Sequence, residues 1–319
     1  MIWDLFLIAV GLGLLVVAGD ALVKGAVNLA LRLGIPALIV GLTVVAFGTS
    51  APELMVSIAA VLDGAPAIAL GNVIGSNTAN ILLVLGLPAI ISAIRTDESD
   101  TRESATIMIA ATVLFILICF MGPIRWPHAL VLLGALALIL SRQIREALAH
   151  RAERRAADEE VEAADPKMPG WKIGAFIAAG LVGLPFGADF LVTGASSIAR
   201  SFGISEAVIG LTLVAVGTSL PELATSVTAA MRGRADVALG NVIGSNIFNL
   251  LSIIGFAGLV GPLPVPEGML HFDLWVMLGA SVLLLPFVFY RWPITRGIGI
   301  GFTLIYAAYV VVLMAGGTA

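Results

Sequence analysis

The stretch that decides the fold is Gly48-Thr49-Ser50-Ala51-Pro52-Glu53-Leu54, and it returns as Gly217-Thr218-Ser219-Leu220-Pro221-Glu222-Leu223. A second stretch follows each copy. It reads Gly71-Asn72-Val73-Ile74-Gly75-Ser76-Asn77 after the first and Gly240-Asn241-Val242-Ile243-Gly244-Ser245-Asn246 after the second. Matched residues lie 169 positions apart throughout, as Glu53 and Glu222 do. A constant offset indicates an internal repeat, because composition bias alone would let the register drift.

The composition is that of a membrane protein. Of the 319 residues, 59% are hydrophobic and 12% are charged, whereas a soluble chain carries about 25% charged residues. The mean hydropathy is +1.06. The apolar runs are continuous, which excludes a strand barrel, where apolar and polar residues would alternate. The single cysteine, Cys119, excludes a disulfide framework.

Ten apolar runs are long enough to cross a membrane as helices. The predicted spans are 2–31, 37–61, 67–94, 105–121, 127–140, 171–198, 207–231, 237–260, 271–290 and 294–314. A polar stretch that carries most of the charge separates them into two groups of five. We therefore expect a first repeat at 1–143, a cytoplasmic linker at 144–170 and a second repeat at 171–319.

The lysines and arginines predict the orientation, because basic residues gather on the cytoplasmic side of a membrane. With the N-terminus outside, only Arg125 and Arg200 of the 17 lysines and arginines fall on the outer side. We therefore expect a plasma (inner) membrane protein with both termini outside and the 144–170 loop in the cytoplasm.

An odd number of spans per repeat places the second repeat upside down relative to the first. The equivalent loops agree with this, since Asp63-Gly64-Ala65 has no basic residue and Arg232-Gly233-Arg234 has two. Inverted repeats with interrupted helices are typical of secondary transporters. The predicted fold is an all-α polytopic membrane protein, with ten transmembrane helices in two inverted five-helix repeats and broken helices at the midplane.

Glu53 and Glu222 each place a carboxylate inside an apolar run. An ionised carboxylate at mid-membrane is costly and by default marks an ion path or a substrate site. The alternative is a structural carboxyl group that is paired with a buried cation or held protonated. The span of Glu53 contains no lysine or arginine, and Arg232 lies ten residues beyond Glu222. We therefore interpret both glutamates as ion ligands.

Hydroxyl groups precede the proline of each copy, in Thr49, Ser50, Thr218 and Ser219. Proline removes a backbone donor and glycine loosens the same turn, so Gly-Thr-Ser-x-Pro predicts a broken helix. The break would free carbonyls near Ala46 and Ala215. Carbonyls and hydroxyls are hard neutral donors that suit Na⁺ or Ca²⁺. An ordinary proline kink is the alternative, and its duplication beside two carboxylates argues against it.

The second stretch of each repeat adds a polar stripe to an apolar helix. Asn72, Ser76 and Asn80 are spaced i, i+4 and i+8, and therefore share one helix face. Asn77 and Asn246 lie off this stripe, and we interpret them as groups that hydrogen-bond between helices. The candidate ligands of the two stripes are Ser76, Asn80, Ser245 and Asn249.

Together the repeats offer two carboxylates and a set of hydroxyl, amide and carbonyl oxygens. Six to eight oxygens with two negative charges are what dehydrated Ca²⁺ requires. No cysteines or histidines cluster near the repeated stretches, which argues against Zn²⁺ or copper. We expect Ca²⁺ and Na⁺ as substrates and no cofactor.

At these stretches the chain resembles the cation/calcium exchanger superfamily, and specifically its prokaryotic Na⁺/Ca²⁺ antiporters with two α-repeats. The resemblance covers nearly the whole chain. It implies a midplane site between the second, third, seventh and eighth spans, and alternating access by sliding of the first and sixth. By position, the implied cation ligands are Thr49, Ser50, Glu53, Ser76, Asn80, Thr218, Ser219, Glu222, Ser245 and the carbonyls of Ala46 and Ala215.

Asn249 departs from the pattern of many family members, which have Asp at that position. Two acids instead of three leave the Na⁺:Ca²⁺ stoichiometry open, together with any part played by K⁺ or H⁺. Ca²⁺/H⁺ antiport and K⁺-dependent Na⁺/Ca²⁺ antiport are therefore alternatives. We keep Asn249 as a candidate ligand. We expect a monomer in the lipid bilayer that exports Ca²⁺ on the Na⁺ gradient.

Two further classes compete with an antiporter. A passive cation channel would need a permanent pore, whereas two inverted helix breaks favour an alternating site. An intramembrane hydrolase would need a histidine or a metal motif near Ser50 or Ser219. The histidines, His128, His150 and His271, lie near span ends or in loops. We therefore expect no enzyme, and the net charge of −4 predicts no nucleic-acid partner.

Overall fold

The computed structural model describes residues 2–35, 37–97, 101–154, 168–202 and 215–316. Within these ranges the regular elements are helices, and the β-structure consists of two isolated bridges. Eight helices are long and apolar enough to cross a membrane, and a bent helix pair makes a ninth span. The predicted span at 207–231 begins outside the described residues, so only its later part is seen here.

The first repeat contains one long helix, a broken span, a second interrupted span and two further long helices. Its elements are α1 (Ile2–Leu33), α2 (Ala37–Val40), the π-helix η1 (Gly41–Val45), α3 (Ala46–Thr49), α4 (Ala51–Leu62), α5 (Pro66–Ala79), the π-helix η2 (Asn80–Val84), α6 (Gly86–Ile91), α7 (Arg102–Phe120) and α8 (Trp126–Arg154). Helix α8 continues past position 140, where the predicted span ends, so part of the predicted linker is helical.

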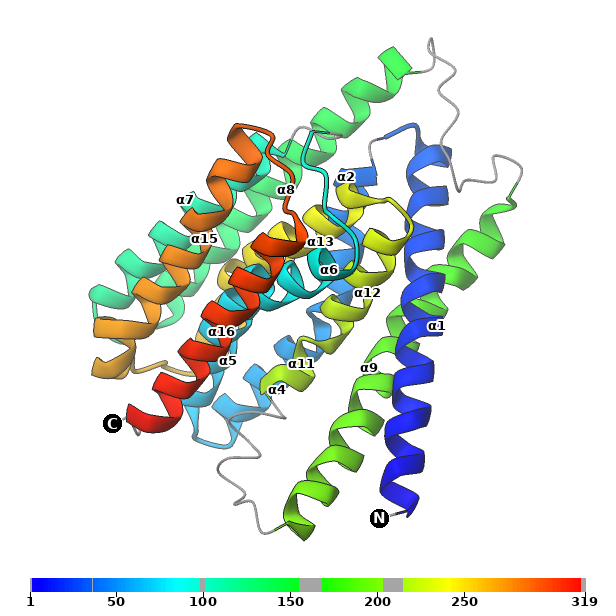
Figure 1. Ribbon diagram of the computed structural model, residues 1–319. Helices are drawn as coiled ribbons and strands as arrows, with labels where there is room; N and C mark the ends of the chain where they lie inside the picture. Colours follow the sequence, from blue (N-terminus) through cyan, green and yellow to red (C-terminus); the bar gives the residue numbers. More distant parts are fainter. Residues whose placement is uncertain (1, 36, 98–100, 155–167, 203–214, 317–319) are drawn as a thin grey trace.

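The second repeat follows the same order. Its elements are α9 (Gly170–Ser201), α11 (Ala215–Thr218), α12 (Leu220–Met231), α13 (Ala235–Phe248), the π-helix η4 (Asn249–Ile253), α14 (Ile254–Val260), the π-helix η5 (Met269–Asp273), α15 (Leu274–Phe289) and α16 (Arg296–Gly316). In Figure 1 the α2–α4 span descends while α11 and α12 ascend. The equivalent spans are therefore antiparallel, as an inverted repeat requires.

The predicted helix breaks are confirmed. Ser50 separates α3 from α4 with φ −81° and ψ 2°, and the two halves of this span are bent by 41°. Ser219 separates α11 from α12 with φ −90° and ψ 4°. In each repeat the proline lies at the start of the following helix, where its missing N–H is tolerated.

The spans that contain α5 and α13 form the centre of the bundle. Windows within Pro66–Ile91 and Ala235–Val260 are 72% and 89% buried, against 17% for Arg296–Leu313. In α13 every residue except Asp236 is buried. Each central span also widens into a π-turn, at Asn80 in one and at Asn249 in the other. The sequence pattern gave no sign of these turns.

Helices α1 and α9 lie against each other along one flank of the molecule (Figure 1). Glycines make this approach possible, because a Cβ atom at Gly180 would lie 2.5 Å from Cβ of Leu22. On the other side of α1, the Nε atom of Arg232 donates a hydrogen bond to Asp20 at 2.7 Å. This ion pair joins α1 to the turn that connects α12 and α13.

The antiparallel arrangement predicts opposite accessibility at the equivalent ends of α4 and α12. Leu62 and Met231 are 71% and 67% exposed. In a Cys119→Ala background, Leu62→Cys and Met231→Cys should react with an impermeant thiol reagent from opposite faces of sealed vesicles. Reaction of both cysteines from the same face would contradict the inverted arrangement.

Candidate cation-binding site

Two carboxylates from opposite repeats lie buried in the centre of the bundle. Glu53, in the first turn of α4, and Glu222, in the first turn of α12, are both 0% exposed. Glu222 Oε1 accepts hydrogen bonds from Ser50 Oγ at 3.2 Å and from Ser245 Oγ at 3.5 Å. Neither oxygen of Glu53 accepts a hydrogen bond from a described residue. A buried carboxylate requires a compensating charge unless it is protonated.

No basic side chain supplies that charge within the part of the chain that the structure describes. The described ion pairs of arginine involve Asp97, Glu103, Asp20 and Asp236. The Glu53 carboxylate instead lies within electrostatic range of Glu222, a charge of the same sign. A mobile cation is therefore the natural partner of this pair.

The hydroxyl groups at the breaks contact the polar stripe of the other repeat. Thr49 Oγ1 donates to Asn241 Oδ1 at 3.2 Å, and Thr218 Oγ1 donates to Asn72 Oδ1 at 3.4 Å. The side chains of Ser219 and Ser76 are linked in the same way, with 3.3 Å between their Oγ atoms. The four repeated stretches therefore meet at one place, although the sequence separates them by up to 192 positions.

The backbone carbonyls at the two breaks differ. The Ala46 carbonyl accepts the amide of Ser50 at 3.0 Å and shares the single proton of the Thr49 hydroxyl, at 3.3 Å, with Asn241 Oδ1. The break therefore does not free this carbonyl in the present conformation, and a cation could bind it only where the Thr49 hydroxyl donates to Asn241 alone. In the second repeat the Ser219 amide bonds to Val216 rather than to Ala215.

Asn80 and Asn249 occupy the first position of the π-turns η2 and η4. They are 1% and 0% exposed. Asn80 Oδ1 accepts no hydrogen bond from the described residues, and neither polar atom of the Asn249 side chain has such a partner. A buried amide oxygen without a donor is costly, and the same oxygen is a suitable ligand for Na⁺ or Ca²⁺.

Asn72 and Asn241 have a supporting role that the sequence interpretation missed. Asn72 Nδ2 donates to the carbonyl of Glu53 at 3.2 Å and to Ser57 Oγ at 3.0 Å. Asn241 makes the equivalent pair of bonds in the second repeat, both at 3.2 Å. These bonds hold the turn that follows each break. Ser57 and Ser226 are also 169 positions apart, and this recurrence was the available signal.

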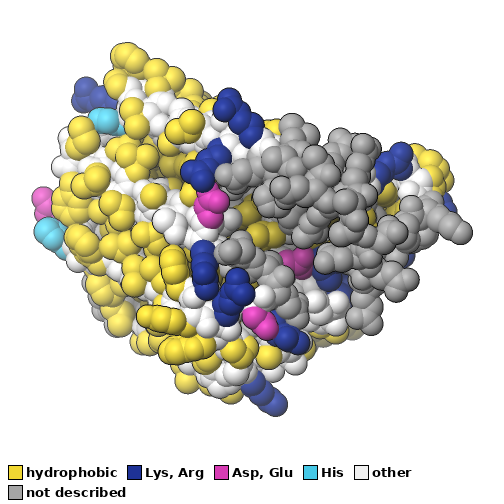
Figure 2. All heavy atoms as spheres, turned by 90° about the horizontal axis from the view of Figure 1, so that it is seen from above, with side chains coloured by type: hydrophobic (Ala, Val, Ile, Leu, Met, Phe, Trp, Pro, Cys, Tyr) yellow, Lys and Arg dark blue, Asp and Glu magenta, His cyan; other side chains and the backbone are white. Residues whose placement is uncertain are grey.

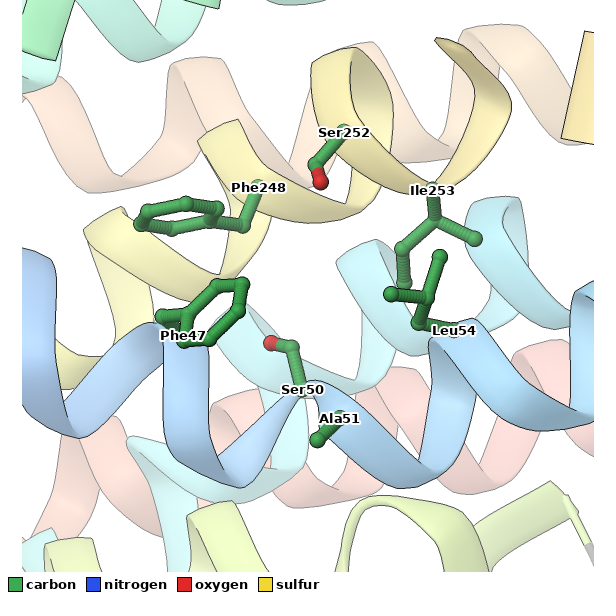
Figure 3. A pocket seen from close by; sticks show the side chains of 7 residues that line it. All are labelled: Phe47, Ser50, Ala51, Leu54, Phe248, Ser252 and Ile253. Carbon is green, nitrogen blue, oxygen red and sulfur yellow. The ribbon is translucent and has the colours of Figure 1, made fainter. Parts of the chain in front are cut away.

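A small cavity borders the site on the side of α13 and η4 (Figure 3). Its volume is about 10 Å³, which is roughly the space that one water molecule needs. The hydroxyls of Ser50 and Ser252 point toward it from opposite walls. Phe47 and Phe248 lie at one end, with 5.6 Å between their ring centroids. The Ser50 hydroxyl is therefore at the edge of the packed core.

The chain matches the Sodium/calcium exchanger protein family over residues 3–145 and 172–315. It belongs to that family. It is 34% identical to the sodium/calcium exchanger MaX1 of Methanosarcina acetivorans over 97% of this chain and 98% of that protein. It is 37% identical to the inner membrane protein YrbG of Escherichia coli K12, over 92% and 91% of the two chains.

The solved structures lead to the same family. A structure of the sodium-calcium exchanger NCX_Mj, soaked with 2.5 mM Na⁺ and 0.1 mM Ca²⁺, matches with a TM-score of 0.83 and 33% identity, over 99% of this chain and 98% of that one. The predicted fold class, a ten-helix membrane protein of two inverted repeats, is thereby confirmed. This member of the exchanger family is a Na⁺/Ca²⁺ antiporter and not an enzyme, and the ions are its substrates.

The two carboxylates generate the first test of the site. Glu53→Gln and Glu222→Gln should each reduce Na⁺-driven Ca²⁺ flux by at least about tenfold, because one negative charge cannot compensate a dehydrated divalent ion in a low-dielectric interior. Glu267→Gln, at an exposed glutamate between α14 and η5, is the matched control. Flux close to wild type in either correctly inserted site variant would show that the carboxylate is not a ligand.

Proposed function

We propose that the oxygens of both repeats form one site that binds Ca²⁺ and Na⁺ in turn and faces the two sides of the membrane alternately. The observation that carries this proposal is the pair Glu53 and Glu222. These carboxylates come from opposite repeats, are fully buried and have no basic partner among the described residues. The Ser50 hydroxyl reaches from the break of one repeat to the carboxylate of the other.

The proposed ligands are the side-chain oxygens that surround this pair, together with two backbone carbonyls. They are Thr49, Ser50, Glu53, Ser76, Asn80, Thr218, Ser219, Glu222, Ser245 and Asn249, and the carbonyls of Ala46 and Ala215. Hard oxygen donors with two formal negative charges suit Ca²⁺ and accept Na⁺. The set contains no thiolate or imidazole that would favour a softer metal.

Charge balance explains why the two fluxes are coupled. One Ca²⁺ or a pair of Na⁺ ions neutralises the two carboxylates, whereas the empty site leaves both charges buried. Moving the empty site through the low-dielectric interior is therefore costly, and moving either loaded form is not. The site therefore changes sides only with Ca²⁺ or Na⁺ bound, and one ion is exchanged for the other. We propose that the Na⁺ gradient drives Ca²⁺ out of the cell.

The proposed orientation places both termini outside and residues 144–170 in the cytoplasm. Lys and Arg side chains are spread over the face seen in Figure 2, with fewer acidic ones among them. This face is the end toward which α8 extends to Arg154, opposite the start of α1 (Figure 1). The positive-inside rule assigns such a face to the cytoplasm. We propose that the chain works as a monomer in the bilayer.

The proposed division of the chain is a first repeat at 1–143, a linker at 144–170 and a second repeat at 171–319. The two segments that match the family, 3–145 and 172–315, support these boundaries. Each proposed repeat contributes one broken span and one π-turn span to the site. Neither repeat by itself holds both carboxylates.

Coupling to K⁺ or H⁺ is the second candidate, and it is raised by the amide at position 249. Because position 249 is an amide, the site has two acids instead of three. No third carboxylate therefore fixes which ion completes the charge balance. These two possibilities differ from plain Na⁺/Ca²⁺ exchange in the gradient that drives Ca²⁺ movement.

Reconstituted protein distinguishes the candidates. We expect liposomes loaded with Na⁺ to take up Ca²⁺ when diluted into Na⁺-free medium, with K⁺ and pH equal on both sides. A K⁺ gradient or a pH gradient alone should drive no uptake, and equal Na⁺ should abolish it. Uptake without any gradient would indicate a channel. A requirement for K⁺, or uptake driven by pH, would replace the proposed coupling with the corresponding alternative.

A further inference from the structure

The two repeats have matched polar residues, but their hydrogen bonds are not matched. Asn80 Nδ2 donates to Asn246 Oδ1 at 3.0 Å. The repeat-related bond would run from Asn249 to Asn77. That bond is not formed, since Asn249 Nδ2 and Asn77 Oδ1 both lack a partner among the described residues.

The side chains of Asn77 and Asn246, which lie off the polar stripes, are also oriented differently. Asn77 Nδ2 donates to the Val73 carbonyl of its own helix at 2.7 Å. Asn246 Nδ2 instead reaches across to the Asn77 carbonyl at 3.2 Å and contacts Met108 Sδ at 3.7 Å. Residues with the same sequence surroundings therefore adopt two arrangements, one bonded within its helix and one bonded between the repeats.

The carboxylates show the same asymmetry. Glu222 accepts hydrogen bonds from Ser50 and Ser245, whereas Glu53 accepts none from the described residues. The repeat-related donors to Glu53 would be Ser219 and Ser76, and these two hydroxyls are bonded to each other instead. One oxygen of Glu222 is thus hydrogen-bonded, whereas neither oxygen of its repeat equivalent Glu53 accepts a hydrogen bond from the described residues.

The inverted repeat offers an explanation for the different hydrogen bonds of the two repeats. Because the two repeats are upside down relative to each other, exchanging their local conformations would produce a state that faces the opposite side of the membrane. The present structure is one such state. The exchanged state would contain a bond from Asn249 to Asn77 in place of the bond from Asn80 to Asn246. It would also contain a hydrogen-bonded Glu53 in place of Glu222.

We propose that Asn246 and Asn77 are positioning residues for transport, and that they hold the amide ligands Asn80 and Asn249 in alternation. In the present state, Asn246 binds the amide nitrogen of Asn80 and leaves its oxygen for the cation. In the exchanged state, Asn77 does the same for Asn249. Each bond therefore stabilises one of the two states. The inference rests on the proposed ligand roles of Asn80 and Asn249.

The alternation predicts effects of opposite sign for substitutions at equivalent positions. Asn246→Leu removes the bond of the present state, and Asn77→Leu removes the bond of the exchanged state. Apparent affinity falls in proportion to the population of the binding-competent state. The ratio of the apparent KM for Ca²⁺ at the two membrane faces should therefore shift in opposite directions, by about fivefold for one net hydrogen bond.

The measurement is Na⁺-dependent ⁴⁵Ca²⁺ flux in right-side-out and inside-out vesicles of wild type, both single variants and the double variant N77L/N246L. In the double variant both bonds are lost, so the KM ratio should return toward the wild-type value. Asn80→Ala removes a proposed ligand together with its bond to Asn246, so it should raise the apparent KM at both faces and also shift the KM ratio in the direction of Asn246→Leu. Asn77→Ala and Asn246→Ala give the same contrast where leucine prevents insertion.

A purely structural role gives a different pattern. Shifts of the KM ratio in the same direction for both single variants would overturn the proposal, and so would an unchanged ratio with only a lower maximal rate. A KM ratio in the double variant that lies further from the wild-type value than in either single variant would also contradict it. These outcomes are separate from failure of the proposed function, which would appear as wild-type vesicles without Na⁺-dependent Ca²⁺ flux.

Discussion

The structure depends on burying two carboxylates that no basic side chain of the described chain neutralises. Glu53 and Glu222 are fully buried, and taking an ionised carboxylate out of water costs several kcal/mol even after the protein relaxes. A nearby arginine would neutralise these carboxylates permanently, and a bound cation would then not be required. The protein instead surrounds them with neutral oxygens, and in the proposed function the transported ion supplies the missing positive charge.

The neutral oxygens become available through defects in the helices. An unbroken helix uses its backbone groups internally and presents a side chain only every few residues on one face. The break at Ser50 brings a hydroxyl to the Glu222 carboxylate of the opposite repeat, and the break at Ser219 brings one to Ser76 of the opposite repeat. The π-turns at Asn80 and Asn249 widen the helix where the two buried amides lie, in keeping with the frequent occurrence of π-bulges at functional sites.

The rest of the molecule separates into a close-packed centre and a paired flank. The α5 and α13 spans are covered on most sides, whereas α1 is largely exposed outside its contact with α9 and a smaller one with α12. Close contacts at glycines pack α1 against α9, and the Asp20–Arg232 ion pair connects α1 to the turn between α12 and α13. Sliding of the first and sixth spans is what the family resemblance implies. A mutually packed pair is suited to move as a unit.

The sequence by itself determined the membrane class, the inverted repeat and the residue types of the site. These features depend on hydropathy and on a constant offset of 169 positions, which need no knowledge of contacts. It also predicted both helix breaks, because proline and glycine act locally on the backbone. It did not predict the π-turns or the roles of Asn72 and Asn241, since these depend on the partner helix and not on the local sequence.

Only the tertiary structure decided which of these oxygens are hydrogen-bonded. The Ala46 carbonyl, expected to be free, is hydrogen-bonded, because the broken turn closes on its own amide and hydroxyl donors. Glu53 and Glu222 are equivalent in sequence but differ in hydrogen bonding, and so do Asn77 and Asn246. A repeat specifies the same residues twice. The two copies become unequal only when they pack against each other, because one helix interface cannot satisfy both sets of donors in the same conformation.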